Sequence, residues 1–406
     1  MNDWPSLKYV TRFEYGEALA QEVRTDGEVP VFGSNGVTGT HNASNTLGPA
    51  IVVGRKGSFG KVTWTDVPGF CIDTAYFIDQ RHTSANLRWL YWALQTLGLD
   101  IHSEDTGVPG LSREKAYQSK LRLPSPAEQE RIADLLDERT TRIDALIAEK
   151  EQLLEKLSEY QYSYASSLMT CGLNPDVAVT HTSFPEVDAV PSHWSVKRLK
   201  FLGEVRSGVA KGKDLGDKDT VSLPYLRVAN VQDGYVDLTE VLEIEVGQDE
   251  VNRYLLQKGD VLMNEGGDND KLGRGTVWEG QIDPCIHQNH VFAVRLFDAS
   301  LAEWVARFTS TDAARSYFFL RSKQSTNLAS INQSNVRELP IPMPPAEERL
   351  AIIDELRRSS AATTELMKHT EEHIARLREY RSSLISAAVT GQLGVDSLGC
   401  PELEAA

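Results

Sequence analysis

Leu123-Pro124-Ser125-Pro126-Ala127-Glu128-Gln129-Glu130-Arg131-Ile132 is the stretch that decides the fold, because the chain repeats it. The second copy reads Ile341-Pro342-Met343-Pro344-Pro345-Ala346-Glu347-Glu348-Arg349-Leu350, at an offset of 218 residues (349 − 131). Downstream, Leu157-Ser158-Glu159-Tyr160 matches Leu377-Arg378-Glu379-Tyr380 at an offset of 220 residues (377 − 157). A period this long, present in two copies, indicates a duplicated chain and not a solenoid.

Each copy begins like a helix. In the first copy Ser125 predicts an N-cap, Pro126 the first helical position and Glu128 a capping box. Each helix is expected to end near a glycine, Gly172 in the first copy and Gly391 in the second. Apolar side chains recur at multiples of three and four, as in a heptad seam, at Ile132, Leu136, Ile143, Leu146, Leu153, Leu157, Tyr160, Tyr164 and Leu168. The second seam comprises Ile353, Leu356, Met367, Ile374, Leu377, Leu384 and Ala388.

A helix of about 40 residues is about 60 Å long and cannot bury its apolar face alone. For one such run, a generic dimerisation coiled coil would be the plain interpretation. Two matched runs occur here in one chain, each after a globular segment. We therefore predict that they pack against each other as an antiparallel coiled coil, in a pseudo-two-fold internal repeat.

The segments before the two copies have the Gly-rich, β-former-rich pattern of mixed domains with a late helix, expected over 84–99 and over Ala302–Arg321. The predicted fold class is α+β, with two mixed β-rich domains separated by two long helices. The predicted boundaries are 1–123 and 181–341 for the domains, 124–173 and 342–393 for the helical regions, and 394–406 for a tail.

The chain carries 42 Lys and Arg against 58 Asp and Glu, a formal charge of −16, which argues against a generic nucleic-acid-coating protein. Its four cysteines form no C-x-x-C pair, so neither a zinc site nor a disulfide framework is indicated. No basic start is followed by an apolar run, and no apolar stretch approaches the ~18 residues of a membrane span. We expect a soluble, reduced, cytoplasmic protein.

Two motifs are rejected as cofactor or metal sites. Gly54 to Gly60-Lys61 is one residue too long for a phosphate-binding loop, and Val62 replaces the hydroxyl that would hold Mg²⁺. His369-Thr370-Glu371-Glu372-His373 matches a zincin pattern, but it lies inside the repeated helix with no third ligand indicated. No methyltransferase motif is present, so we predict no cofactor, no metal and no catalytic residue.

Two variable domains, each followed by a Pro-Ala-Glu-x-Glu-Arg-type helix, resemble the specificity subunit of a type I restriction-modification enzyme. The resemblance is carried further by five stretches: Pro30–Gly36, Ile51–Lys61, His193-Trp194, Gly259–Gly267 and Lys271–Gly275. It implies two target-recognition domains, each reading half of a bipartite site on double-stranded DNA. It also implies that the helices set the spacing and dock two methyltransferase subunits, to which restriction-translocase subunits are added. The chain itself would be non-catalytic.

The first domain offers five candidate DNA contacts. Arg55, Lys56, Ser58 and Lys61 lie on one Gly-rich loop, where Arg or Lys can address guanine edges or phosphate. The alternative is a solvated hairpin tip. Asn35 could read adenine, but Asn-Gly favours a turn.

The second domain offers five more. Asn264, Lys271 and Arg274 form the matching loop, and Gln288 and Asn289 are amides suited to bidentate adenine contacts. The alternative for these residues is the capping of strand ends.

The charge is uneven along the chain. Residues 1–122 hold 12 basic and 13 acidic groups, whereas 123–180 hold 5 and 11. Phosphate attraction is then expected to come largely from partners, and the isolated chain should bind DNA poorly. The alternative function is an acidic coiled-coil scaffold that presents two ligand-binding modules. A DNA-modifying enzyme is disfavoured by the missing motifs.

Overall fold

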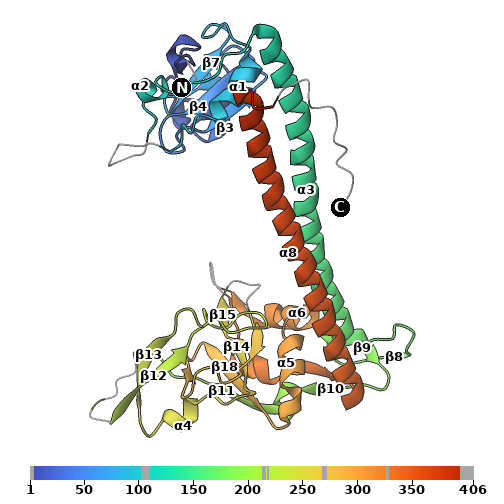
Figure 1. Cartoon of the computed structure of the whole chain (residues 1–406). Helices are drawn as coiled ribbons and strands as arrows, with labels where there is room; N and C mark the ends of the chain where they lie inside the picture. Colours follow the sequence, from blue (N-terminus) through green and yellow to red (C-terminus); the bar gives the residue numbers. More distant parts are fainter. Residues whose placement is uncertain are drawn as a thin grey trace. The chain divides into compact units, whose positions relative to one another are not determined.

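The computed structural model describes residues 4–101, 110–212, 216, 219–267, 272–324 and 329–393 (Figure 1). The chain divides into two compact units, one of Met1–Gln152 with Thr370–Ala406, the other of Leu153–His369. The division falls inside two long helices, α3 (Pro126–Cys171) and α8 (Ala346–Thr390), so each unit holds a mixed domain and part of both helices. The predicted α+β class is confirmed. No described helix is long and apolar enough to cross a membrane.

The domain of the first unit is built on a four-stranded antiparallel sheet in the order β1-β7-β4-β5. Its strands are β1 (Glu14–Tyr15), β4 (Ala50–Gly54), β5 (Val62–Thr65) and β7 (Ala75–Asp79). β4 and β7 are buried along their whole length, as continuous apolar runs require. In a smaller sheet, β2 pairs antiparallel with β3 and parallel with β6. The remaining elements are β2 (Val29–Gly33), β3 (Gly36–His41), β6 (Phe70–Cys71), η1 (Leu7–Tyr9), η2 (Gln21–Val23), α1 (Leu87–Gln95) and α2 (Arg113–Ala116).

The domain of the second unit repeats this plan. Its four-stranded antiparallel sheet has the order β11-β18-β14-β16, and β12 pairs antiparallel with β13 and parallel with β17. These strands are β11 (Gly203–Ser207), β12 (Thr220–Leu226), β13 (Leu242–Gly247), β14 (Val261–Asn264), β16 (Gly275–Val277), β17 (Ile286–His287) and β18 (Val291–Leu296). The smaller strands are β8 (Val179–His181), β9 (Ala189–Pro191), β10 (Ser195–Arg198), β15 (Gly266–Gly267), β19 (Lys323–Gln324), β20 (Ala329–Ser330) and β21 (Pro340–Met343). The helical elements are η3 (Pro185–Val187), η4 (Leu199–Phe201), η6 (Ala299–Leu301), α4 (Val251–Tyr254), α5 (Ala302–Phe308), α6 (Asp312–Arg321) and α7 (Gln333–Arg337).

The pairing registers show which residues of the two sheets correspond. Val52 of β4 pairs with Thr63 on one side and with Phe77 on the other. Leu262 of β14 pairs in the same way with Thr276 and Ala293. Two residues farther on, Gly54 and Asn264 end their strands at the same place in each sheet. The loops that follow therefore leave the two domains from equivalent positions.

In the first unit, α1 lies between the sheet and α3 (Figure 1). Its Arg88 donates through Nε to both carboxylate oxygens of Asp137 on α3, at 2.8 and 2.9 Å. Trp92 donates to the same carboxylate at 2.8 Å. The main-chain N–H of Asn86, which caps α1, donates to Gln129 Oε1 at 2.8 Å. These contacts fix the domain on its helix.

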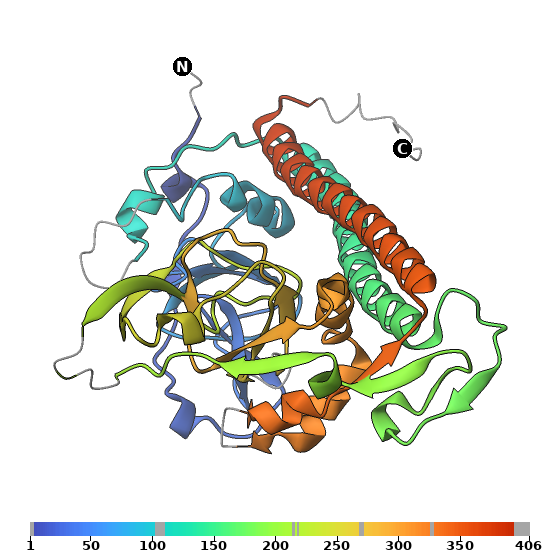
Figure 2. The same ribbon diagram turned by 90° about the horizontal axis from the view of Figure 1, so that it is seen from below.

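α3 and α8 lie side by side within each unit (Figure 2). In the first unit Arg378 pairs with Glu151 at 2.7 Å and Arg381 with Asp144 at 2.8 Å. In the second unit Gln161 donates to Ser360 Oγ at 2.9 Å and Tyr164 to Glu355 at 3.2 Å. In both units the residue numbers rise along one helix as they fall along the other, so the helices run antiparallel there.

Two sequence predictions differ from the structure in detail. On α3 the buried position after Ile143 is Ile147, whereas Leu146 is only half-buried and Leu153 is 40% exposed. The stretch Ala302–Arg321 is two helices, α5 and α6, because Thr311 caps a new helix by accepting from the Ala314 N–H. The predicted ends are confirmed: α3 and α8 stop one residue before Gly172 and Gly391, whose φ of 77° suits glycine.

Candidate nucleic-acid interface

The candidate contacts of the first domain gather at one end of its sheet. Ser34 and Asn35 form the two-residue turn between β2 and β3. Lys61, at the end of the loop after β4, donates through Nζ to the main-chain oxygen of Asn35 at 2.8 Å and to Oδ1 at 2.9 Å. Asn35 thus serves the turn that its sequence favours, and it also joins this turn to the Gly-rich loop. We call residues 34–35 and 55–61 the first loop cluster.

Arg55 is held by its surroundings. Its guanidinium donates to the Asp73 main-chain oxygen at 3.1 Å and lies 5.0 Å from the centre of the Tyr15 ring. Arg113 lies 4.7 Å from the centre of the same ring, so two guanidinium groups contact one tyrosine. Burial raises the pKa of the adjacent Tyr76 to about 12, with Tyr15 adding to the rise, so Tyr76 is neutral near pH 7. Tyr15 was missed by sequence reasoning, because nothing in its neighbourhood links it to a loop forty residues away.

Lys56 and Ser58 are exposed, as are Asn35 and Lys61 of the first loop cluster. The Lys56 ammonium has no ion pair with any residue that the structure describes. The main-chain N–H groups of Arg55 and Lys56 both donate to the Thr74 oxygen, at 2.9 and 3.1 Å, which anchors the base of the loop. Gly57 and Gly60 have φ of 74° and 77°, and this allows the tight return of the chain. The cluster can present two or three cations to a polyanion.

The candidate DNA contacts of the second domain that the structure describes do not form a single cluster of exposed side chains. Asn264 is 1% exposed, and its amide donates to the Val231 oxygen at 2.9 Å. It therefore faces the interior, where it ties β14 to the segment near Val231. Arg274 is half-buried and donates to Gln232 Oε1 at 2.7 Å. Gln232, which the sequence did not point to, holds Arg274 in place. Lys271 lies outside the described residues.

Gln288 and Asn289 lie between β17 and β18, at the same end of the sheet as Asn264, which pairs with Val291. Their main-chain N–H groups donate to the oxygens of Leu226 and Val209, both at 2.9 Å. Their side-chain amides are half-buried and make no hydrogen bond to the described part of the chain. The turn is therefore held by the backbone, and both amides remain available to a ligand.

Metal-binding capacity and the protonation state of His287 bear on what these surfaces can bind. Among the residues that the structure describes, no group of three or more His, Cys, Asp or Glu could hold a metal ion. His287, next to Gln288, is fully buried, and burial lowers its pKa to about 4, so it is neutral at pH 7. The polar groups that the two loop regions present are amides, a hydroxyl and cationic side chains.

Comparison with known proteins agrees with this description. The family model of the type I restriction modification DNA specificity domain matches residues 6–156 and 191–376. The chain therefore belongs to the family of type I restriction-modification specificity proteins.

Its relatives carry the same name at low identity. The chain is 24% identical over 276 residues to the EcoKI specificity subunit of Escherichia coli (strain K12), a match covering 67% of this chain but only 57% of that protein. It is 21% identical to the EcoDI specificity subunit of Escherichia coli over 96% of this chain and 89% of that protein. A chain from a solved structure on assembly and conformational transition of the type I system has a TM-score of 0.69. That match covers 96% of this chain and 98% of that chain at 13% identity, which supports the fold alone.

Proposed function

We propose that this chain is the DNA-reading, non-catalytic subunit of a type I restriction-modification complex. Residues 1–123 and 181–341 are the two target-recognition domains, and each reads one half of a bipartite site on double-stranded DNA. Residues 124–173 and 342–393 form an antiparallel coiled coil that sets the spacing and docks two methyltransferase subunits. Restriction-translocase subunits join through them.

One observation carries this proposal. The two domains share one strand order, yet the loops that leave equivalent strand ends differ: Arg55-Lys56 follows Gly54, whereas Glu265 follows Asn264. A common scaffold with different polar loops is what two readers of different half-sites need, since base edges are read by side chains and not by the scaffold. DNA repeats every ~34–36 Å per turn, so two readers on one duplex need a stiff connection.

Methylome sequencing tests the proposal directly. The chain is expressed with the methyltransferase subunit encoded beside it, in a host that lacks both, and modified sites are mapped. We expect one bipartite motif that disappears when this gene is deleted. Exchanging residues 181–341 for those of another family member should change one half of the motif and leave the other half intact. Unchanged methylation without this gene would contradict the proposal.

The net charge of −16 favours a further feature of this function, namely that partners supply most of the phosphate attraction. The isolated chain should then bind DNA poorly. Nanomolar, sequence-specific binding by the chain alone at physiological salt would contradict this. The alternative, an acidic scaffold for two ligand-binding modules, predicts that pull-down recovers no methyltransferase.

A further inference from the structure

One short surface turn occurs in both domains and takes no part in the loops described above. Leu7-Lys8-Tyr9 forms η1 in the first domain, and Leu199-Lys200-Phe201 forms η4 in the second. In each turn the leucine is fully buried and the aromatic ring faces solvent, with Tyr9 75% exposed and Phe201 64% exposed. We call these the first and second aromatic turns.

The local geometry of the two turns is also the same. The N–H of Leu7 donates to the Ser119 oxygen at 2.8 Å, and that of Leu199 to the Leu339 oxygen at 2.9 Å. The lysine ammonium lies over the aromatic ring in both, 4.7 Å from the Tyr9 centre and 5.2 Å from the Phe201 centre. The turns thus agree in backbone anchorage, buried leucine, cation and ring.

Both aromatic turns lie at the end of the sheet away from the candidate reading loops. In the first domain β7 begins beside the first loop cluster and ends at Asp79. Shortly after that end, the main-chain oxygen of His82 accepts from the N–H of Arg12, three residues after Tyr9. In the second domain β18 begins beside Gln288 and Asn289 and ends at Leu296, after which the Phe297 N–H donates to Leu202. Five or six residues of strand separate the two ends by roughly 17–20 Å.

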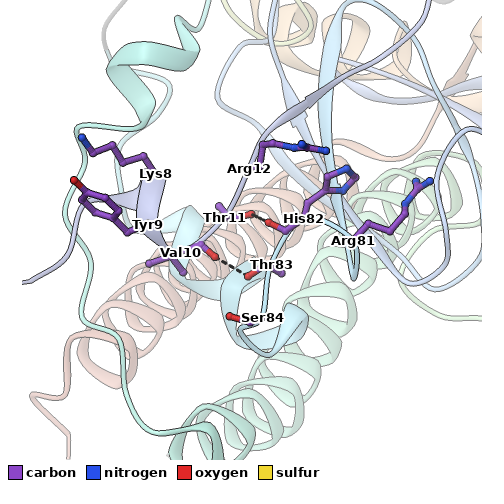
Figure 3. A pocket seen from close by; sticks show the side chains of 9 residues that line it. All are labelled: Lys8, Tyr9, Val10, Thr11, Arg12, Arg81, His82, Thr83 and Ser84. Atoms are coloured by element: carbon purple, nitrogen blue, oxygen red, sulfur yellow. Dashed lines mark hydrogen bonds between the residues drawn. The ribbon is translucent and has the colours of Figure 1, made fainter.

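The surroundings of the first turn are cationic. An open hollow of about 430 Å³ lies beside it (Figure 3). Figure 3 shows Lys8 and Tyr9 on one side of the hollow and Arg12 and Arg81 on the other. Arg12 pairs with Glu14 at 3.1 Å and Arg81 with Asp79 at 2.5 Å. Lys8 pairs with no acidic group in the described part of the chain, so it is left to attract a carboxylate.

The surroundings of the second turn are more apolar. Phe297, 74% exposed, follows the strand that pairs with β11, and its main-chain N–H donates to the oxygen of Leu202, the residue after Phe201. Glu338 accepts from Lys200 at 2.5 Å and pairs with Arg198 at 3.2 Å, so one carboxylate faces two cations. Asp298, after Phe297, caps η6. The feature common to both turns is an exposed ring beneath a lysine.

We propose that the two aromatic turns are docking points for two copies of one partner protein, each copy presenting an apolar side chain beside a carboxylate. The proposal rests on the proposed function, in which the two domains read different DNA but bind the same kind of subunit. A surface that serves DNA reading should differ between the domains, whereas one that serves a shared partner should be the same. Aromatic rings such as Tyr9 and Phe201 are enriched at protein interfaces, and tyrosine is among the side chains that dominate binding energy there.

The test replaces the rings in the full-length chain. Tyr9→Ser, Phe201→Ser and the double variant are each mixed with the methyltransferase subunit encoded beside this gene. Bound copies per chain are counted by native mass spectrometry, and affinity is measured by sedimentation. We expect two copies on the unchanged chain, at least tenfold weaker binding of one copy for each single variant, and of both copies for the double variant. Tyr235→Ser, which removes an aromatic ring of 60% exposure elsewhere in the second domain, should bind like the unchanged chain.

The outcomes separate the two levels of the proposal. If the unchanged chain binds two copies and all three variants bind equally well, the docking proposal is overturned while the proposed function stands. If binding of the subunit is unaffected but DNA binding by the assembled complex falls, the turns are a DNA surface and the docking proposal is again overturned. If the unchanged chain binds no copy, the proposed function fails and the docking proposal with it. Circular dichroism and thermal unfolding verify that each variant folds.

Discussion

Lys61 donates two hydrogen bonds to Asn35, one to its main-chain oxygen at 2.8 Å and one to Oδ1 at 2.9 Å. A lysine ammonium has three donors, so one remains for a ligand. The pair joins a turn and a loop that are separate in the sequence, and it places a positive charge between them. This geometry suits contact with a phosphate better than reading of a base.

The first prediction concerns that charge. Lys61→Met should weaken DNA binding by the assembled complex to a similar degree on all sequences, because phosphate contacts carry no sequence information. The slope of log K against log salt concentration should become shallower by about 0.9. Fluorescence anisotropy at several salt concentrations measures both. Lys258→Met, at the opposite end of the second domain's sheet, is the matched control. If Lys61→Met instead removes the preference for one particular base pair of the site, Lys61 reads a base.

The second prediction concerns the support of Arg55 by Tyr15. If Arg55 reads a base, Tyr15→Leu should relax discrimination at the same position as Arg55→Ala, by roughly tenfold to a hundredfold, the range of one good base contact. Tyr15→Phe should preserve discrimination, since it keeps the ring. The double variant with Tyr15→Leu and Arg55→Ala should discriminate between bases at that position no less well than Arg55→Ala alone. Methylation rates on duplexes with single base changes provide the measurement, and additive losses would count against the support.

The third prediction concerns the second domain. Arg274→Ala should alter the half-site read by that domain and leave the first half-site unchanged. Gln232→Ala should act in the same direction but more weakly, because it removes only the acceptor that holds Arg274 at 2.7 Å. Methylome sequencing of cells carrying each variant shows which half changes. An equal loss on all sequences would reduce Arg274 to a phosphate contact.

The fourth prediction concerns the attachment of the first domain to α3. Asp137→Ala removes the acceptor of Arg88 and Trp92 and leaves the indole N–H of the buried Trp92 without a partner. Unpaired donors of this kind cost about 1–3 kcal/mol. Denaturant unfolding should show a decrease of that size in the free energy of unfolding. Asp134→Ala, which changes an exposed aspartate one turn earlier, should leave it almost unchanged. Equal midpoints for the two variants would mean that the contact does not stabilise the unit.

Sequence reasoning predicted the long helices, their ends and the α+β class, because capping residues and glycines act locally. It chose Leu146 in place of Ile147, since both are apolar and only the packing of the facing helix decides between them. It combined α5 and α6, because helix-forming residues flank the short polar stretch 309–312 on both sides, and the side-chain cap at Thr311 is seen only in the structure. For the candidate site it found the loops but not Tyr15 or Gln232. Partners distant in the chain are joined by strand pairing, which no local pattern records.

His287 gives the last prediction, a dependence of stability on pH. Its Nδ1 donates to the Val291 oxygen at 2.6 Å, and its buried Nε2 has no partner among the described residues. Burial lowers its pKa from 6.5 to about 4 in the folded chain. Below about pH 6.5 the unfolded chain therefore takes up a proton at His287, whereas the folded chain does not until the pH is near 4. The free energy of unfolding is therefore at its full value above about pH 6.5, and it decreases by on the order of 3 kcal/mol as the pH falls toward 4.

Urea unfolding between pH 4 and 7 should show this dependence of the unfolding free energy on pH. His287→Asn, which keeps a donor near Nδ1, should lose the dependence. His181→Asn, which changes an exposed histidine, should retain the slope. Identical slopes for His287→Asn and the unchanged chain would mean that another group sets the acid sensitivity.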